Sequence, residues 1–242
     1  MHFSGDNSPH YRNSEEGLDR EQVLNNLKTV VKQLSNNFPP STKIIPALGN
    51  HDSFPADNYP DIRINSTNED FYTEYITKGA LGDFLSHSGD KRNSFVENCG
   101  FYVFKDYDIY QDEFNVTQTF IVLNTNLYYN NIADTKQDDP CDQLALLESH
   151  LANVTDDENV FIVGHVPPGF FDLYPAEPFY NNENITRKLI DIVTSDENSK
   201  KIIAHFYGHT HISSFRLLFR DSDSDSPSGI AFIAPSVTPR VS

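Results

Sequence analysis

Apolar positions along this chain alternate between helical spacing and short continuous runs. Between residues 21 and 34 they recur every three or four residues, which is the spacing of an amphipathic helix. The chain then breaks at Phe38-Pro39-Pro40, and residues 43–48 form an apolar run typical of a buried strand. Because Asp6 would end a preceding strand, this order predicts a strand–helix–strand unit.

The rest of the chain continues to alternate in the same way. Strands are predicted over 101–104, 119–123, 159–163 and 202–207, helices over 141–151 and 186–194, and a hairpin over 215–219 and 230–233. Residues 53–100 are expected to be irregular, with some helix between 71 and 85, and to form an insertion over the site. No internal repeat or linker divides the sequence, so we predict one α/β domain over residues 1–242.

Composition narrows the classes of function. The net charge of −17 disfavours binding to a nucleic-acid polymer, because neutralising phosphates requires a basic surface. A small phosphate ester remains compatible with this charge, since bound metal ions would reverse the local field. No run of about 18 apolar residues occurs, so no membrane span is expected.

Two features bear on the cellular compartment. Sequons for N-glycosylation occur at Asn65, Asn115, Asn153 and Asn184. All four fall in predicted loops or helix ends, which favours a secreted or lysosomal protein, although the first residues show no signal-peptide pattern. Cys99 and Cys141 could form a disulfide or remain two separate thiols, because sequence gives no distance between them.

Side chains that can bind metal ions follow four of the apolar runs. They are Asp6, Asn50, His165, His209 and His211. In α/β proteins ligands bind at the carboxyl ends of parallel strands, so we expect these side chains to meet there. A carboxylate can bridge two cations, while amide oxygens and imidazole nitrogens complete the coordination. His209 and His211 would face opposite ways in an extended segment, so a turn must aim both inward.

Two further histidines are candidates for proton transfer and substrate contact. Two metal ions roughly 3.5–4 Å apart would activate water for attack on phosphorus. His51, beside Asn50, is placed to protonate the departing oxygen. His10 could contact the substrate phosphate or the leaving group, and Asp52 could orient His51 or a metal-bound histidine. The alternative is that these motifs hold buried structural groups or turn residues; their order favours the metal site.

Longer segments resemble the acid sphingomyelinase family of calcineurin-like metallophosphoesterases. They are 46–52, 123–129, 164–169 and 206–211, together with the Gly-Asp-x-x-x-His pattern of residues 5–10. Residues 124–129 are closer to the acid sphingomyelinase-like phosphodiesterase branch. The resemblance implies a four-layer α/β/β/α sandwich and a di-zinc centre that hydrolyses phosphodiesters with a metal-activated hydroxide. It also implies secreted or lysosomal glycoproteins.

The resemblance assigns roles to the candidate residues. Asp6 would bridge two zinc ions, and Asn50, His165 and His209 would complete one metal site. His211 would serve the other site, while His51 and His10 would act at the leaving group. The family's Asp-x-His motif would precede Gly5, so the resemblance implies a sandwich lacking its first strand and a domain incomplete at both ends. A chain of this extent is expected to be inactive or nearly so by itself.

Three functions remain open from sequence. The first is a metal-dependent phosphodiesterase acting on nucleotide-type or sphingomyelin-type diesters. The second is a true sphingomyelin phosphodiesterase, and the third is a non-catalytic fragment that binds one metal ion. The expected partners are a small phosphodiester or phospholipid substrate, with lipid reached at a membrane surface, and neither a nucleic-acid polymer nor an obligate protein partner.

Overall fold

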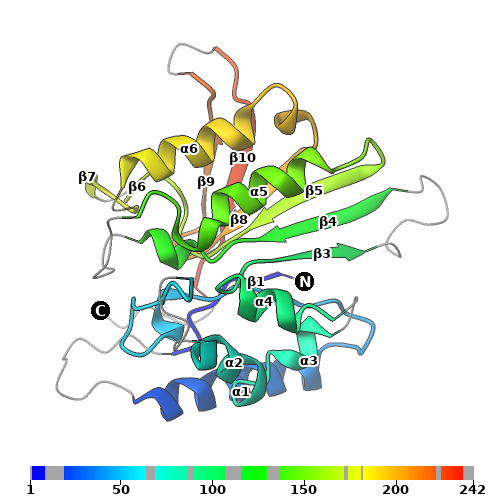
Figure 1. Cartoon of the computed structure of the whole chain (residues 1–242), viewed down its shortest axis with the longest axis vertical. Helices are drawn as coiled ribbons and strands as arrows, with labels where there is room; N and C mark the ends of the chain where they lie inside the picture. The colour runs from blue at the N-terminus through cyan, green and yellow to red at the C-terminus, as the bar shows by residue number, and fades with distance from the viewer. Residues whose placement is uncertain are drawn as a thin grey trace.

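The fold is taken from a computed structural model. It describes residues 2–8, 19–63, 69–86, 90–106, 116–129, 137–171, 174–180, 182–221 and 225–236. Figure 1 shows two sheets between two groups of helices, with α5 and α6 on the large sheet and α1 to α4 beyond the small one. This arrangement confirms the predicted α/β sandwich.

The small sheet contains the predicted strand–helix–strand unit. Strands β1 (His2–Phe3) and β2 (Ile45–Pro46) pair in parallel, and α1 (Arg20–Asn37) connects them. The Asp19 side chain accepts a hydrogen bond from the Gln22 backbone, while the Gln22 side chain accepts one from the Asp19 backbone. This capping box satisfies two backbone donors and fixes where the helix begins.

The large sheet has six strands in the order β3-β4-β5-β8-β10-β9. Their bounds are β3 Tyr102–Asp106, β4 Thr117–Val122, β5 Glu158–Val163, β8 Ile202–Tyr207, β9 Ser214–Leu218 and β10 Gly229–Ile233. The four central strands are parallel, and β3 and β9 run antiparallel at the two edges. Strands β4 and β5 have no exposed side chain on either face, which fits their largely apolar sequences, whereas Ile203 of β8 and Phe232 of β10 are exposed. The predicted strands and hairpin are confirmed.

Helices cover the two outer faces. On the large sheet lie α5 (Gln143–Ala152) and α6 (Glu183–Thr194), close to the predicted ranges. Residues 53–100, expected to be mostly irregular, form three short helices, α2 (Glu69–Thr77), α3 (Gly82–Leu85) and α4 (Arg92–Glu97). Their buried aromatic side chains, including Tyr72 and Phe95, pack edge to face and make this segment a packed layer.

Two connections hold the layers together. The Tyr102 hydroxyl of β3 donates a hydrogen bond of 2.6 Å to the Pro46 carbonyl of β2. A disulfide joins Cys99, which follows α4, to Cys141, which precedes α5. The pairing that sequence left open is therefore a disulfide.

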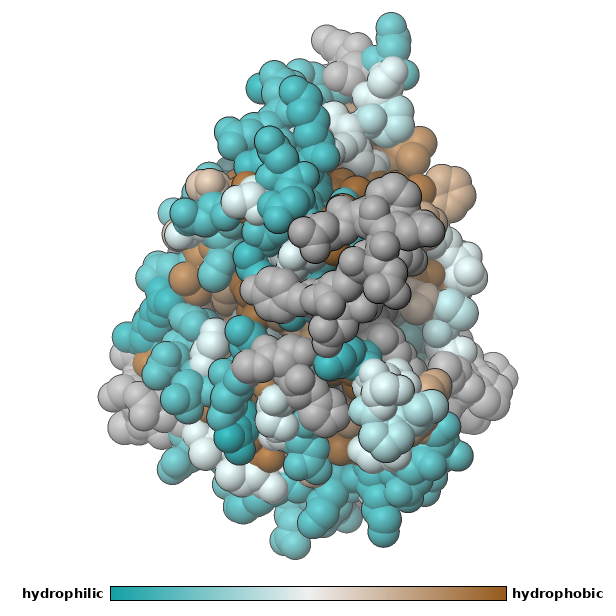
Figure 2. All heavy atoms as spheres, turned by 90° about the vertical axis from the view of Figure 1, so that its right-hand side faces the viewer, coloured by the Kyte–Doolittle hydropathy of each residue, from teal (hydrophilic) through white to brown (hydrophobic). Residues whose placement is uncertain are grey.

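The remaining elements are short. A two-stranded hairpin is formed by β6 (Phe170–Phe171) and β7 (Tyr174–Pro178). Short 3-10 turns cover Asn50–Asp52, Thr125–Tyr128, Pro140–Asp142 and Asn198–Lys200. Within the described ranges, no helix has both the length and the apolar character needed to cross a bilayer. Figure 2 shows a largely hydrophilic face, with brown atoms gathering at its upper right.

Candidate metal centre

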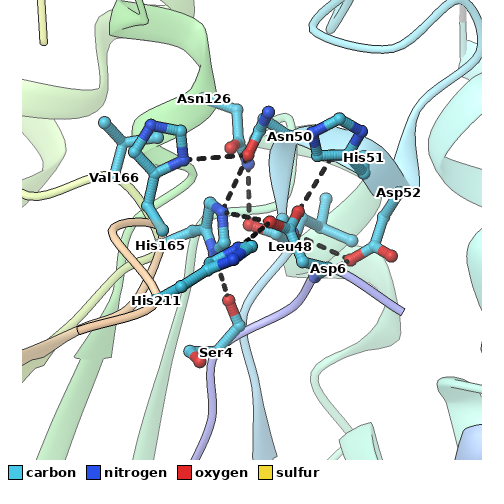
Figure 3. Close-up of polar contacts among 12 residues, drawn as sticks. Ser4, Asp6, Leu48, Asn50, His51, Asp52, Asn126, His165, Val166 and His211 are labelled. Carbon is cyan, nitrogen blue, oxygen red and sulfur yellow. Dashed lines mark hydrogen bonds and ion pairs between the residues drawn. The ribbon is translucent and has the colours of Figure 1, made fainter. Parts of the chain in front are cut away.

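The candidate ligands follow the carboxyl ends of four strands. Asp6 follows β1 and Asn50 follows β2, which are neighbours in the small sheet. His165 follows β5 and His209 follows β8, which are neighbours in the large sheet. Because these strands pair in parallel within each sheet, their ends bring the four loops together (Figure 3).

The side chains converge on a small volume. The Asn50 Oδ1 atom lies 2.9 Å from His165 Nε2 and 3.0 Å from His209 Nδ1. The Asp6 Oδ2 atom lies 3.2 Å from His165 Nε2 and 4.0 Å from His211 Nε2. The five residues that sequence grouped are therefore neighbours in space, and their role as metal ligands remains a prediction.

Left-handed backbone makes this convergence possible. Asp6, His209 and His211 have φ values of 58°, 70° and 62°, which are uncommon for residues with a side chain. The turn after β8 thereby aims both histidines at the centre, as expected for a pair separated by one residue. A Cβ at Gly49 would lie 2.0 Å from the Asp6 backbone nitrogen, so only glycine allows this approach.

The donor set fits a divalent cation. Asp6 Oδ2 is buried and makes no hydrogen bond to the described residues. His165 Nδ1 contacts the Ser4 carbonyl, which leaves Nε2 facing the centre in the way typical of metal-ligating histidines. Asn50 Nδ2 donates to Asp57 Oδ1 at 2.7 Å, so its Oδ1 is turned inward. A carboxylate, an amide oxygen and imidazole nitrogens together suit a transition metal.

Asp57 was not found by sequence reasoning. It has a φ of 64° in an otherwise undistinguished loop, and no motif marks it.

A second cluster, Asp61 with Cys99 and Cys141, also has metal-ligand spacing. Because both cysteines are bound in the disulfide, that cluster offers no thiolates to a metal.

Charge is balanced between the carboxylate and the imidazoles. Burial raises the pKa of Asp6, but the adjacent His165, and then His211 and His51, lower it well below its usual value. Burial lowers the pKa of His165, but the Asp6 carboxylate and the Ser4 carbonyl raise it overall. Burial and then the charge of His165 lower the pKa of His209 to about 3. Its imidazole is therefore neutral and has a lone pair for a metal ion.

Asp52 connects the two loops that follow the strands of the small sheet. Its Oδ2 accepts hydrogen bonds of 2.9 Å from the backbone nitrogens of Asp6 and Gly49. Its Oδ1 accepts one of 2.7 Å from the Asn7 backbone nitrogen. The carboxylate therefore binds the two loops of the small sheet to each other. Whether Asp52 also orients a histidine stays a prediction.

The other histidines fall into three groups. The His51 backbone nitrogen donates to Asp6 Oδ1 at 2.9 Å, and its ring lies beside Asn50 (Figure 3). His10 lies outside the described residues. His205 is buried in β8, and His150 stacks on Phe101 at an exposed position of α5. The side chains of His2 and His87 are also outside the described part.

Asp, Asn and His side chains cluster where the parallel strands of the two sheets end. A family model described as calcineurin-like phosphoesterase matches residues 3–213. The chain belongs to the calcineurin-like phosphoesterase family, and this family implies a divalent metal ion.

Curated proteins give a finer comparison. The chain is 32% identical over 247 residues to human cyclic GMP-AMP phosphodiesterase SMPDL3A, covering 99% of this chain and 48% of that protein. It is 30% identical to human acid sphingomyelinase-like phosphodiesterase 3b, covering 98% and 48%. It is 30% identical to sphingomyelinase phosphodiesterase C of Dictyostelium discoideum, covering 98% and 49%. These proteins confirm the resemblance seen in the sequence.

These matches cover only part of each relative. The chain spans about half the length of the curated relatives it matches. A solved structure of PhoD shares 17% identity and a TM-score of 0.37 over 49% of this chain and 27% of PhoD, a likeness too low to carry an argument.

Proposed function

We propose that this chain carries the reaction centre of a metal-dependent phosphodiesterase. The observation that carries the proposal is the convergence of Asp6, Asn50, His165 and His209. The buried Asp6 Oδ2 atom faces the His165 and His211 imidazoles and accepts no hydrogen bond from the other described residues. Relatives of about 30% identity bear phosphodiesterase names, which supports the same chemistry.

Zinc is the proposed metal. Asp6 would bridge two ions, with Asn50, His165 and His209 holding one and His211 serving the other. Three imidazole nitrogens beside one carboxylate favour zinc over magnesium, which prefers oxygen ligands. Divalent cations bound there would neutralise the substrate phosphate and supply Lewis acidity for the attack of water.

The chain's own residues supply positioning and a proton. The Asp6 carboxylate accepts a hydrogen bond of 2.9 Å from the His51 backbone nitrogen, which places this residue beside the centre. We assign His51 to protonation of the departing oxygen, as a general acid within reach of the substrate ester. His10 stays a candidate for contact with the phosphate or the leaving group.

The substrate class is a small phosphodiester of nucleotide or sphingomyelin type. The relatives support both, since one is named a cyclic GMP-AMP phosphodiesterase and another a sphingomyelinase phosphodiesterase. Comparing turnover of a cyclic dinucleotide with turnover of sphingomyelin in mixed micelles separates the two. Turnover of sphingomyelin alone would favour a true sphingomyelin phosphodiesterase, with lipid reached at a membrane surface.

The central experiment compares Asp6→Asn with Asp139→Asn. Asp139 receives backbone hydrogen bonds at the start of α5 and is remote from the centre in sequence and in its contacts. Metal content and hydrolysis of a chromogenic phosphodiester are measured for both variants and for the unaltered chain. We expect Asp6→Asn to lose bound zinc and at least a hundredfold in any turnover, and Asp139→Asn to retain both.

The outcomes separate the hypotheses. Binding of one zinc ion without turnover by the unaltered chain would favour the non-catalytic fragment. Absence of metal binding, or undiminished zinc in Asp6→Asn, would overturn the proposed centre.

We also propose a secreted or lysosomal glycoprotein. Asn153 and Asn184, in two of the four sequons, are exposed. The disulfide between Cys99 and Cys141 supports an oxidising compartment. Expression in animal cells, followed by enzymatic removal of N-glycans, should reduce the mass of the secreted product. An unchanged mass would contradict glycosylation.

A further inference from the structure

Residues 124–129 form a buried turn that contributes no ligand to the centre. The turn follows β4 and contains a 3-10 turn over Thr125–Tyr128. Thr125 and Asn126 are completely inaccessible to solvent. Buried polar side chains are stable only when they are hydrogen-bonded, so the partners of these two residues indicate what the turn does.

Thr125 holds the loop that carries His165. Its hydroxyl oxygen accepts hydrogen bonds from the backbone nitrogens of His165 at 3.1 Å and Val166 at 2.8 Å. These donors lie just beyond the end of β5, where the sheet no longer satisfies them. The Thr125 methyl group also lies so close to Gly164 that a Cβ there would meet it at 2.8 Å. The threonine therefore fixes the position and direction of the loop backbone at His165.

Asn126 holds the loop that carries Asn50. Its Nδ2 donates to the Leu48 carbonyl at 2.7 Å, across the boundary between the two sheets (Figure 3). It also donates to Asn124 Oδ1 at 2.8 Å. Asn124 is anchored in turn by Nδ2, which donates to the Cys99 carbonyl at 2.8 Å. Leu48 is two residues before Asn50, so this contact fixes the position of the backbone that leads to the Asn50 amide.

Tyr129 packs on the third ligand. Its ring meets the His209 ring edge to face, with centroids 4.8 Å apart and an interplanar angle of 77°. Phe179 meets the same imidazole at 5.3 Å and also at 77°. Edge-to-face aromatic contacts of this geometry are favourable because the positive ring edge meets the negative ring face. The His209 ring is thus held in one orientation before any metal binds.

We propose that the 124–129 turn is the positioning element of the metal centre. It contacts three ligand loops that leave three strands of two separate sheets, and it sets their mutual spacing through Thr125, Asn126 and Tyr129. Metal affinity depends on ligand placement within about 0.5 Å, so this turn determines affinity without touching the ion. The inference rests on the proposed function, because it requires that the centre binds a metal.

The test compares Thr125→Val with Thr194→Val. Both threonines are buried, and the Thr194 hydroxyl bonds only within α6, to the Ile190 carbonyl at 2.7 Å, according to the described contacts. Zinc affinity is measured by competition with a chromogenic chelator, and stability by urea unfolding in excess chelator. Loss of a group that orients metal ligands typically lowers metal affinity about 10–100-fold. We expect such a loss in Thr125→Val and unchanged affinity in Thr194→Val.

Conservative variants separate positioning from general damage. Thr125→Ser keeps the hydroxyl acceptor and should restore affinity to within about threefold of the unaltered chain. Tyr129→Phe keeps the ring and should bind zinc normally, whereas Tyr129→Leu should bind it more weakly. These comparisons remain informative if Thr125→Val folds poorly.

Two results would refute different parts of the proposal. If the unaltered chain binds zinc, Asp6→Asn does not, and Thr125→Val binds with unaltered affinity, the positioning role is wrong while the proposed centre stands. If the unaltered chain binds no zinc, the centre itself is refuted and the positioning role is refuted with it.

Discussion

His205 makes the stability of this protein depend on pH. It lies on β8 beside Ile162 of β5 and Ala231 of β10, with 2% of its surface exposed. Its Nδ1 atom has no hydrogen-bond partner among the described residues, and its ring stacks on Tyr207. Burial lowers the pKa of His205 from 6.5 to about 4.

The direction and size of the effect follow from proton linkage. In the unfolded chain the imidazole takes up a proton near pH 6.5, whereas in the folded protein it does so only near pH 4. Between these values the unfolded state binds more protons, so stability falls as the pH falls. At about pH 5 the loss relative to pH 8 is about 2 kcal/mol, and its limit below pH 4 is about 3 kcal/mol. A domain stability of about 5–15 kcal/mol makes this readily measurable.

The assay is urea unfolding at about pH 8 and pH 5 for the unaltered chain and for His205→Leu. Excess chelator is present so that metal binding does not contribute. His205→Leu should lose about 2 kcal/mol less on acidification. His150→Leu is the control, because that histidine is exposed and lacks the near-complete burial of His205. Equal acid losses in His205→Leu and the unaltered chain would refute a neutral buried imidazole.

Three other predictions concern contacts that hold the loops and layers. Asp52→Asn places an amide NH₂ group against backbone donors and should lower the free energy of unfolding by about 2–4 kcal/mol in urea; no change would contradict its role. Reducing the Cys99–Cys141 disulfide, which spans a sequence separation of 42, should cost about 4 kcal/mol in the same assay with and without a thiol. Arg216→Ala removes a bond to the Phe170 carbonyl and should lower stability by about 1–2 kcal/mol, with Arg216→Lys intermediate.

Much of the fold could be predicted because burial leaves a local pattern. Strand β5 has no exposed side chain and β8 has one, Ile203, so each contains a continuous apolar run. Helix α1 shows helical spacing because only one side is buried. The candidate ligands directly follow such runs, and strand ends are where α/β sites form. The grouping of Asp6 with His165 therefore required only the order of the elements.

The supporting contacts could not be predicted in this way. Asp52 binds backbone atoms 45 and 46 residues earlier, and Asn126 binds the carbonyl of a residue 78 positions earlier. No local pattern encodes a pairing over that distance. The left-handed backbone of His209 is equally hidden, because histidine adopts it only where surrounding contacts stabilise it. For the same reason residues 53–100 were expected to be irregular, although aromatic packing orders them into helices.

Five of the supporting side chains share one property: they bind the backbones of the ligand loops. Thr125 and Asp52 accept from backbone N–H groups, while Asn126, Tyr59 and Tyr75 donate to backbone carbonyls of residues 48, 49 and 52. A group that bound the ligating atoms themselves would compete with a metal ion for their lone pairs. Support through the backbone fixes each ligand while its donor atoms stay directed at the centre. A substitution in this supporting set should therefore change how tightly a metal is held without changing which metal is preferred, because the donor atoms remain the same.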